Sequence, residues 1–382
     1  MTANSRDLVN TILTKGSSPE RMGLYEAFWP ETLQGWIEQG YPTETQMVNG
    51  KPEAVPVNPA FHFGYDMVHC GGLFDVDPIQ GYRETLEETD DWEVVKNGAG
   101  AQLKYWKHKS GTPEHVGFAM SSRAIWDQAY RPHLLDLDRR RFESGYWKGG
   151  GTLAQDRETL ARAQAQNRWC SYGHVFLWEV LRQDLGDVCL YESLLLDPGW
   201  IRDFNRVYTD FFKIHFAALF DELGLPDGIW IYEDLGYKVG LAASPKVLGE
   251  LVFPYYAELV DFFHGRGLPV VLHSCGNITE ALPMIVDAGF DALNPMEVKA
   301  GCDTLAFAEQ YGADLAFVGG FDVRILEAND HDLIRREVTA MIEGIKARGA
   351  RYLFHTDHSI SPRITYDTYR VAVDTYREHM VY

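Results

Sequence analysis

The chain of 382 residues is long enough for one large α/β barrel with extensions, or for two domains. Its formal net charge of −20, without a long Lys/Arg run, argues against a nucleic-acid partner, because binding to a phosphate backbone depends on clustered basic residues. No apolar run approaches the ~20 residues needed to span a bilayer, and residues 1–18 lack an apolar signal segment, so we expect a cytoplasmic protein without a membrane partner.

The N-terminal residues contain few regular patterns. We expect residues 1–60 to form a helical extension, in which Ser18-Pro19-Glu20 has the capping serine, first-turn proline and early acid of a helix start. Three prolines make residues 52–59 a linker. The apolar and aromatic residues 61–67 then form the candidate first strand of the core.

Residues 82–120 predict a separate small antiparallel structure. Charged residues or threonines alternate with apolar residues, and the turn signals Asn97-Gly98 and Ser110-Gly111 interrupt them. We therefore expect a β-hairpin or meander inserted outside the main sheet. Residues 121–165 are expected to be helical, with Arg139-Arg140-Arg141 on a solvated helix face.

From Gly228 onward, short apolar strands alternate regularly with helical segments. A long helix is expected to begin at Ser244-Pro245 and to end at Gly265 and Gly267. Consecutive βα units imply a parallel sheet with right-handed crossovers, which suits a (β/α)8 barrel or a doubly wound sheet. We favour a (β/α)8 TIM barrel over residues 61–382, because no G-x-G-x-x-G follows a strand. The predicted strands are 228–232, 268–272, 292–293, 315–318 and 352–354.

Polar residues follow each of these strands. In a barrel, all of them would face one mouth at the carboxyl ends of the strands, where ligands bind. A shared site explains this repetition better than independent helix caps do. The residues are Glu233, Asp234, His273, Cys275, Asn294, Glu297, Asp322, His355, Asp357 and His358.

Within this set, His273, Cys275 and His358 form the best metal constellation. Imidazole and thiolate together suit zinc, and three protein ligands with one open position are typical of catalytic zinc. Glu297, Asp234 or a substrate atom would supply the fourth ligand. By contrast, we expect His355 to be a hydrogen-bonded core histidine and Cys302 to be a packed thiol, while Asp357 would orient a ligand histidine.

The sequence motifs resemble the uroporphyrinogen decarboxylase superfamily, which includes corrinoid-linked, zinc-dependent methyltransferases. The resemblance runs from about residue 228 to 382 and implies a (β/α)8 barrel with its site at the carboxyl-end mouth. It is clearest in Tyr232-Glu233-Asp234-Leu235-Gly236-Tyr237, Ser244-Pro245, His273-Ser274-Cys275-Gly276-Asn277 and Gly319-Gly320-Phe321-Asp322.

The resemblance also implies a ligand set. The methyltransferases hold zinc through a H-x-C pair, which His273 and Cys275 match, and through a later cysteine, which is absent here and in whose region His358 stands. Asn294 and Asp322 are assigned to contacts with a corrinoid. No Arg-Gln-Ala-Gly-Arg run occurs, which counts against porphyrinogen decarboxylation.

Three functions stay open at this point. The first is a zinc-dependent methyltransferase that moves a methyl group between a small thiol, methoxy or methylamine substrate and a corrinoid (cobalamin) on a partner protein. In it Glu233, Asp234 or Glu297 would donate or accept protons. The second is a metal-free decarboxylase, and the third a non-catalytic ligand- or metal-binding barrel. The sequence does not decide whether the chain is a homodimer.

Overall fold

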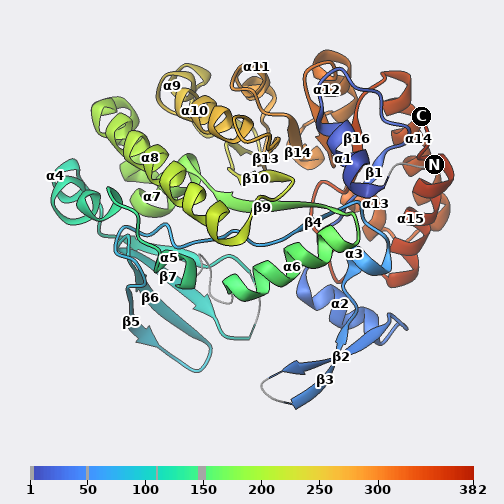
Figure 1. The fold of residues 1–382 in the computed structure, drawn as a ribbon, viewed down its shortest axis with the longest axis horizontal. Helices are drawn as coiled ribbons and strands as arrows, with labels where there is room; N and C mark the ends of the chain where they lie inside the picture. Colours follow the sequence, from blue (N-terminus) through green and yellow to red (C-terminus); the bar gives the residue numbers. More distant parts are fainter. Residues whose placement is uncertain (1–3, 49–50, 109–110, 145–151) are drawn as a thin grey trace.

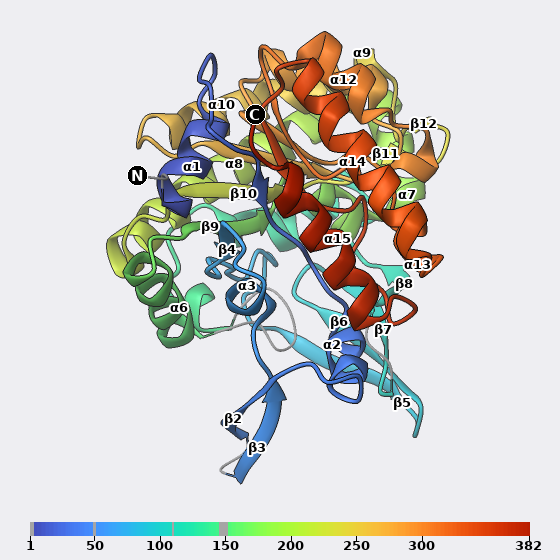
Figure 2. The same ribbon diagram turned by 90° about the vertical axis from the view of Figure 1, so that its right-hand side faces the viewer.

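The computed structural model describes residues 4–48, 51–108, 111–144 and 152–382. Its centre is a sheet of eight parallel strands (Figures 1 and 2). From β4 to β16 each strand pairs with the next along the chain, and β1 pairs with β16. The strands are β1 (Gly23–Leu24), β4 (Met67–His69), β9 (Trp169–Val175), β10 (Gly228–Tyr232), β13 (Val270–Ser274), β14 (Ala292–Pro295), β15 (Ala316–Val318) and β16 (Tyr352–Phe354).

The seam between β1 and β4 is the place where the sheet nearly closes on itself. The N–H of Asp66, just before β4, donates to the carbonyl oxygen of Leu24 on β1 at 2.8 Å. The carboxylate of Asp66 also accepts from the guanidinium of Arg21 at 2.6 and 2.9 Å. Because strand order around the sheet follows chain order, the fold is a nearly closed (β/α)8 barrel, and the predicted fold class is confirmed.

Apolar side chains fill the part of the barrel interior that lies away from the mouth. Alternate residues of each strand point inward, because side chains change face at every step of a strand. Helix α1 (Ser5–Leu13) adds its apolar face to this interior cluster and so closes the end of the barrel opposite the mouth. The cluster includes Leu8, Val9, Ile12, Leu13, Met67, Trp169, Trp230, Val271, Ala292, Ala316, Val318 and Leu353.

Helices surround the barrel and bury its outer face. The helix expected from Ser244-Pro245 is split into α9 and α10, because Pro254 cannot donate an intrahelical hydrogen bond and Val252 leaves helical geometry. No helix among the described residues has the length and apolar character of a bilayer span. The surrounding helices are α7 (Leu177–Leu196), α8 (Pro198–Leu223), α9 (Pro245–Leu251), α10 (Phe253–His264), α11 (Leu282–Asp287), α12 (Thr304–Tyr311), α13 (Val323–Glu327), α14 (His331–Ala347) and α15 (Tyr366–His379).

The N-terminal 60 residues differ from the expected helical extension. They contain α1 and α2 (Pro30–Ile37), but also the barrel strand β1 and a hairpin of β2 (Thr43–Val48) with β3 (Lys51–Pro56), where a linker was expected. Residues 18–20 form no helix. The barrel therefore starts at β1 and not after residue 60.

The expected first strand at 61–67 is also wrong. Asn58 caps the short helix α3 (Pro59–His62) by accepting from the N–H of Ala60, and Pro59 occupies its first position. The second barrel strand, β4, begins only at Met67.

An antiparallel sheet forms where the meander was predicted. It contains β5 (Arg83–Glu88), β6 (Trp92–Asn97), β7 (Ala101–Trp106) and β8 (Glu114–Phe118), paired in chain order. This sheet and the β2–β3 hairpin both project below the barrel in Figures 1 and 2. Phe118 packs on the backbone of Gly186, where α7 is kinked and a Cβ would lie 2.4 Å from the phenyl ring.

The region 121–165 is helical in short pieces, and residues 145–151 lie outside the described residues. The pieces are α4 (Arg123–Ile125), a π-helical turn (Trp126–Tyr130), a 3-10 turn (Arg131–Leu134), α5 (Arg141–Ser144) and α6 (Leu153–Ala165). The expectation of a solvated arginine face is wrong for Arg141. Its buried guanidinium donates to the carbonyl oxygens of Asp75, Asp77, Pro78 and His133.

The remaining short elements lie close to the mouth of the barrel or in its loops. They are β11 (Gly236–Tyr237), β12 (Gly240–Leu241), and the 3-10 turns Thr279–Ala281 and Val298–Ala300.

Candidate metal centre

His273 and Cys275 lie at the carboxyl end of β13, as expected, and their side chains face each other. The distance from Cys275 Sγ to His273 Nε2 is 3.4 Å. The loop after them is held by carboxylates from neighbouring strands. Asp234 Oδ1 accepts from the N–H of Cys275 at 2.9 Å, and Glu297 Oε2 accepts from the N–H of Gly276 at 2.7 Å.

Asn294 fixes the orientation and the tautomer of His273. The two residues are in register on β14 and β13. Asn294 Nδ2 donates to the carbonyl oxygen of Val318 at 2.8 Å, so its Oδ1 must be the atom that meets His273 Nδ1 at 2.5 Å. His273 Nδ1 therefore carries the proton, and Nε2 presents a lone pair toward Cys275. This is the arrangement that orients metal-ligating histidines in proteins.

Two overlapping groups of ligand atoms lie at the mouth. The first joins Asp234, His273 and Cys275, and the second joins Cys275, Glu297 and His358, with all ligand atoms of a group within 4.8 Å of one another. The predicted trio of His273, Cys275 and His358 is thus divided between the two groups, which share the thiol. In the first group Asp234 Oδ1 lies 3.8 Å from His273 Nε2, and in the second Glu297 Oε1 lies 3.9 Å from His358 Nε2.

The electrostatics of this set fit a bound cation. Burial, with the nearby carboxylates of Asp234 and Glu297, raises the pKa of the Cys275 thiol well above its usual range. A divalent cation would offset the repulsion among these groups and hold the sulfur as a thiolate. One imidazole nitrogen, one sulfur and carboxylate oxygens are a ligand set that zinc accepts.

Glu233 does not lie at the mouth, contrary to the prediction of a catalytic role. Tyr232 faces the barrel interior, so the next residue points outward into the helix layer. There the carboxylate accepts from the N–H groups of Phe176 at 2.5 Å and Trp178 at 2.6 Å, and from the hydroxyl of Tyr256. Burial raises the pKa of Glu233 to about 8. Its role is to anchor the N-terminus of α7.

The two residues assigned to corrinoid contacts have other partners. Both polar atoms of Asn294 are engaged within the protein, so the structure gives it the role of a positioning residue for His273 and not of a cofactor contact. Asp322 caps α13 by accepting from the N–H of Arg324, and its carboxylate also pairs with that guanidinium at 2.6 Å. Its contact with a corrinoid stays a prediction.

Three further residues near the mouth were expected to have structural or orienting roles. His355 is a buried core histidine stacked on Tyr25, with its Nε2 3.4 Å from Glu26 Oε1. Cys302 is a packed thiol that donates to the carbonyl oxygen of Gly276 at 3.4 Å. Asp357 accepts from the N–H groups of Val298 and Val323, and its Oδ2 lies 3.7 Å from His358 Nδ1.

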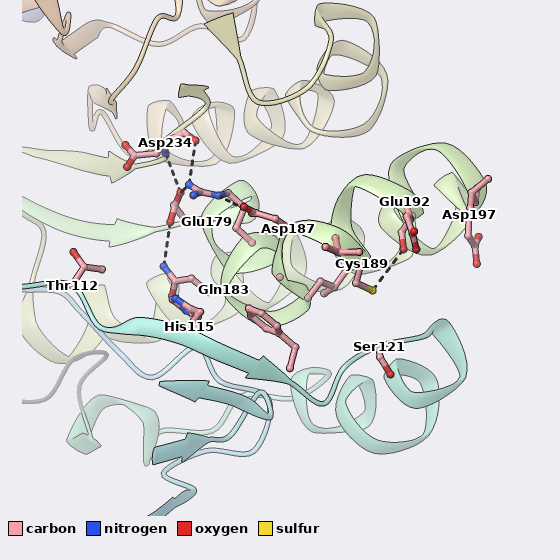
Figure 3. A pocket seen from close by; sticks show the side chains of 17 residues that line it. Thr112, His115, Ser121, Glu179, Gln183, Asp187, Cys189, Glu192, Asp197 and Asp234 are labelled. Carbon is pink, nitrogen blue, oxygen red and sulfur yellow. Dashed lines mark hydrogen bonds and ion pairs between the residues drawn. The ribbon is translucent and has the colours of Figure 1, made fainter. Parts of the chain in front are cut away.

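Two cavities adjoin the ligand groups. One of about 480 Å³ opens above Cys275 and Glu297 and is bordered by Lys238, Lys299 and Arg324. The other is a groove of about 860 Å³ between α7 and β8, with Asp234 at one end. Figure 3 shows Glu179, Gln183, Asp187 and Cys189 along α7, with His115 and Thr112 on the side of β8. The smaller cavity thus reaches Cys275 and Glu297, and the groove reaches Asp234.

Sequence reasoning missed the aromatic residues beside His273 inside the barrel. Tyr25, His69 and Tyr232 line the barrel interior at this level. The alternation Trp230, Tyr232 along β10 could have placed Tyr232 there. Tyr25 gave no such signal, because β1 is only two residues long.

Fold and site together define a (β/α)8-barrel protein with a candidate metal-binding group at the mouth of the barrel. Comparison with known families and proteins agrees with this class. The model of a family described as uroporphyrinogen decarboxylase (URO-D) matches residues 232–379. This match agrees with the resemblance to the uroporphyrinogen decarboxylase superfamily over the C-terminal part of the chain.

Two individual proteins are similar to the chain. A methyltransferase from Methanosarcina mazei has a structure that superposes with a TM-score of 0.63 at 15% identity, covering 98% of each chain, which supports the fold. An S-adenosyl-L-methionine-dependent tRNA 4-demethylwyosine synthase from Methanocaldococcus jannaschii is 26% identical over 124 residues, 31% of this chain. The match spans 37% of the length of that curated relative.

Proposed function

We propose that the protein is a zinc-dependent methyltransferase, which moves a methyl group between a small substrate and a corrinoid carried by a partner protein. The observation that carries this proposal is the hydrogen bond from His273 to Asn294, which leaves Nε2 as a lone-pair donor 3.4 Å from Cys275 Sγ. A zinc ion binds to an imidazole nitrogen that presents its lone pair in this way and to a neighbouring thiolate. The likeness in fold to a methyltransferase is in keeping with this activity.

Different residues at the mouth would bind the metal and exchange protons with the substrate. His273 and Cys275 would hold the ion, with Asp234 from the first ligand group, or Glu297 and His358 from the second, completing the set. When bound, zinc would act as a Lewis acid that stabilises a thiolate or an oxygen leaving group. Asp234, whose side chain is 42% exposed, and Glu297 are placed to exchange a proton with a substrate atom.

The surroundings of the site allow a large partner to approach. The groove of about 860 Å³ ends at Asp234, and the cavity of about 480 Å³ opens above Cys275. Either opening would let a bulky corrinoid reach a substrate held at the metal. Asp322 borders this region through Arg324, which lines the smaller cavity.

The metal content of two matched cysteine variants tests the proposal. We expect the purified protein to retain zinc after dialysis, Cys275→Ala to lose it, and Cys302→Ala to keep it, because Cys302 packs in the loop and is in neither ligand group of the described residues. Elemental analysis on samples with equal thermal stability makes the comparison. Zinc retained by Cys275→Ala, or no zinc in the unmodified protein, would refute the metal site.

A metal-free decarboxylase is the second candidate, and the match of residues 232–379 to the uroporphyrinogen decarboxylase model favours it. In that case, the mouth carboxylates Asp234 and Glu297 would bind N–H groups of a carboxylated substrate. Release of CO2 at an undiminished rate after chelation would support this candidate over methyl transfer.

A further inference from the structure

The barrel interior holds a continuous wall of rings that begins at His273, one of the candidate metal ligands. Neighbouring rings have centroids 4.9 to 6.4 Å apart, and the residues come from five barrel strands or the positions that follow them. Such a wall presents apolar ring surface together with hydroxyl and imidazole groups at one level of the barrel. In order around the wall the residues are His355, Tyr25, His69, Trp230, Tyr232 and His273.

The space enclosed by this wall is not completely filled by side chains. His69, Tyr232 and His273 all face the interior, yet each keeps part of its surface accessible. Gly173 on β9 is paired with Trp230, and a Cβ there would lie 3.0 Å from the phenol ring of Tyr232, so the glycine gives Tyr232 its place in the wall. This accessible surface therefore lies beside His273, on the inner face of the barrel.

The hydroxyls of Tyr25 and Tyr232 have no hydrogen-bond partner among the described residues, and neither is sealed away from a water-sized probe. Buried tyrosine hydroxyls are normally paired. In the same protein, Tyr352 donates to Gly319 and Tyr376 donates to Met22, both at 2.8 Å. Two unpaired, accessible hydroxyls on one ring wall therefore call for an acceptor that the described residues do not supply.

Three of the groups around these hydroxyls carry no charge near neutral pH. Burial lowers the pKa values of His69 and His355 to about 4, and it raises the pKa of Glu26, next to His355, to about 8. A surface of rings and O–H donors with these uncharged neighbours suits a neutral molecule with an oxygen acceptor. It offers a cation no counter-charge.

We propose that Tyr25 and Tyr232 form the substrate subsite, where their hydroxyls donate to the ether oxygen of an uncharged aryl methyl ether. The inference rests on the proposed methyltransferase function and names its substrate class. The aromatic body of the substrate would pack against the ring wall. Its methyl group would then point toward His273 and Cys275 at the mouth.

Binding of three small probes tests this subsite without any turnover. Anisole and ethylbenzene differ only by an oxygen in place of a methylene group, and tetramethylammonium represents a methylated cation. By NMR titration we expect anisole to bind about five- to tenfold more tightly than ethylbenzene, as one or two net hydrogen bonds predict. Tetramethylammonium should bind more weakly than both.

Variants assign the selectivity to the two hydroxyls. Tyr25→Phe and Tyr232→Phe keep the rings and should each remove most of the preference for anisole. Tyr82→Phe is the matched control, because Tyr82 lies next to the antiparallel sheet and donates to Glu84. It should keep the full preference.

Three results would overturn the subsite: no binding of any probe, equal binding of anisole and ethylbenzene to the unmodified protein, or tightest binding of tetramethylammonium. Zinc content measured on the same samples separates the two proposals. If the unmodified protein contains zinc but binds anisole no more tightly than ethylbenzene, only the subsite is refuted. An oxygen preference in a protein that never binds zinc supports the subsite and refutes the metal-dependent function.

Discussion

Replacing Asn294 by leucine should weaken zinc binding while the ligands themselves stay unchanged. Leucine has nearly the same size but can neither accept from His273 Nδ1 nor donate to the carbonyl oxygen of Val318. Loss of the residue that orients a ligand histidine typically lowers metal affinity by about 10- to 100-fold, which corresponds to about 1.4–2.8 kcal/mol. The buried carbonyl of Val318 is also left unpaired, so the free energy of unfolding should fall by about 1–3 kcal/mol.

Two further variants separate orientation from stability. Asn294→Asp retains an oxygen for His273 but no donor for Val318, so it should lose stability and keep near-normal zinc affinity. Asn205→Leu is the matched control, because Asn205 is a buried asparagine that donates to Leu251 O, remote from the mouth. Competition with a chromophoric chelator measures affinity, and urea denaturation measures stability. If Asn294→Leu bound zinc as tightly as Asn205→Leu does, the assigned tautomer of His273 would not matter for the metal.

Two other predictions concern buried carboxyl groups. Glu233→Leu should lower the free energy of unfolding by about 2–5 kcal/mol, because two N–H groups at the start of α7 lose their acceptor. The zinc content per folded molecule should stay unchanged. A loss of zinc in this variant would show that Glu233 does contribute to the metal site. Because the pKa of Glu26 is about 8 in the folded protein and about 4.5 ordinarily, the folded state holds a proton that the unfolded state has lost in this pH window. This group therefore makes stability fall as pH rises, by at most about 1.4 kcal/mol per pH unit. Urea denaturation between pH 6.5 and 8 should give a shallower slope for Glu26→Gln, and an unchanged slope would contradict the raised pKa.

The C-terminal strands were predictable because their sequence signal is local. Residues 228–232, 292–293 and 352–354 are short apolar runs buried on both faces, each bounded by glycine or by polar residues. The mouth was predictable from the same pattern, since residues that follow parallel strands must converge. The juxtaposition of His273 with Cys275 needed only their spacing of two along a strand.

The N-terminal part of the barrel was not predictable in this way. Strand β1 has two residues, and it is identified only by its pairing with β16, more than 300 residues away in the chain. Arg141 likewise looked like part of an exposed basic run. Its burial depends on four carbonyl oxygens from two separate loops, and no local pattern contains that information.

The register of three strands explains both the wrong assignment of Glu233 and the missed role of Asn294. Tyr232, His273 and Asn294 are paired across β10, β13 and β14, so they form one row on the inner face of the barrel. A residue in this row contributes to the site, and the next residue along any of these strands is excluded from it. Glu233 is one step beyond the row and therefore anchors α7. Asn294 lies within the row, beside the histidine, and therefore acts on the ligand and not on a cofactor above it. The chemistry at the mouth thus depends on one row of residues, with one residue from each strand. The sequence contains these residues, but it does not show that they are paired across neighbouring strands.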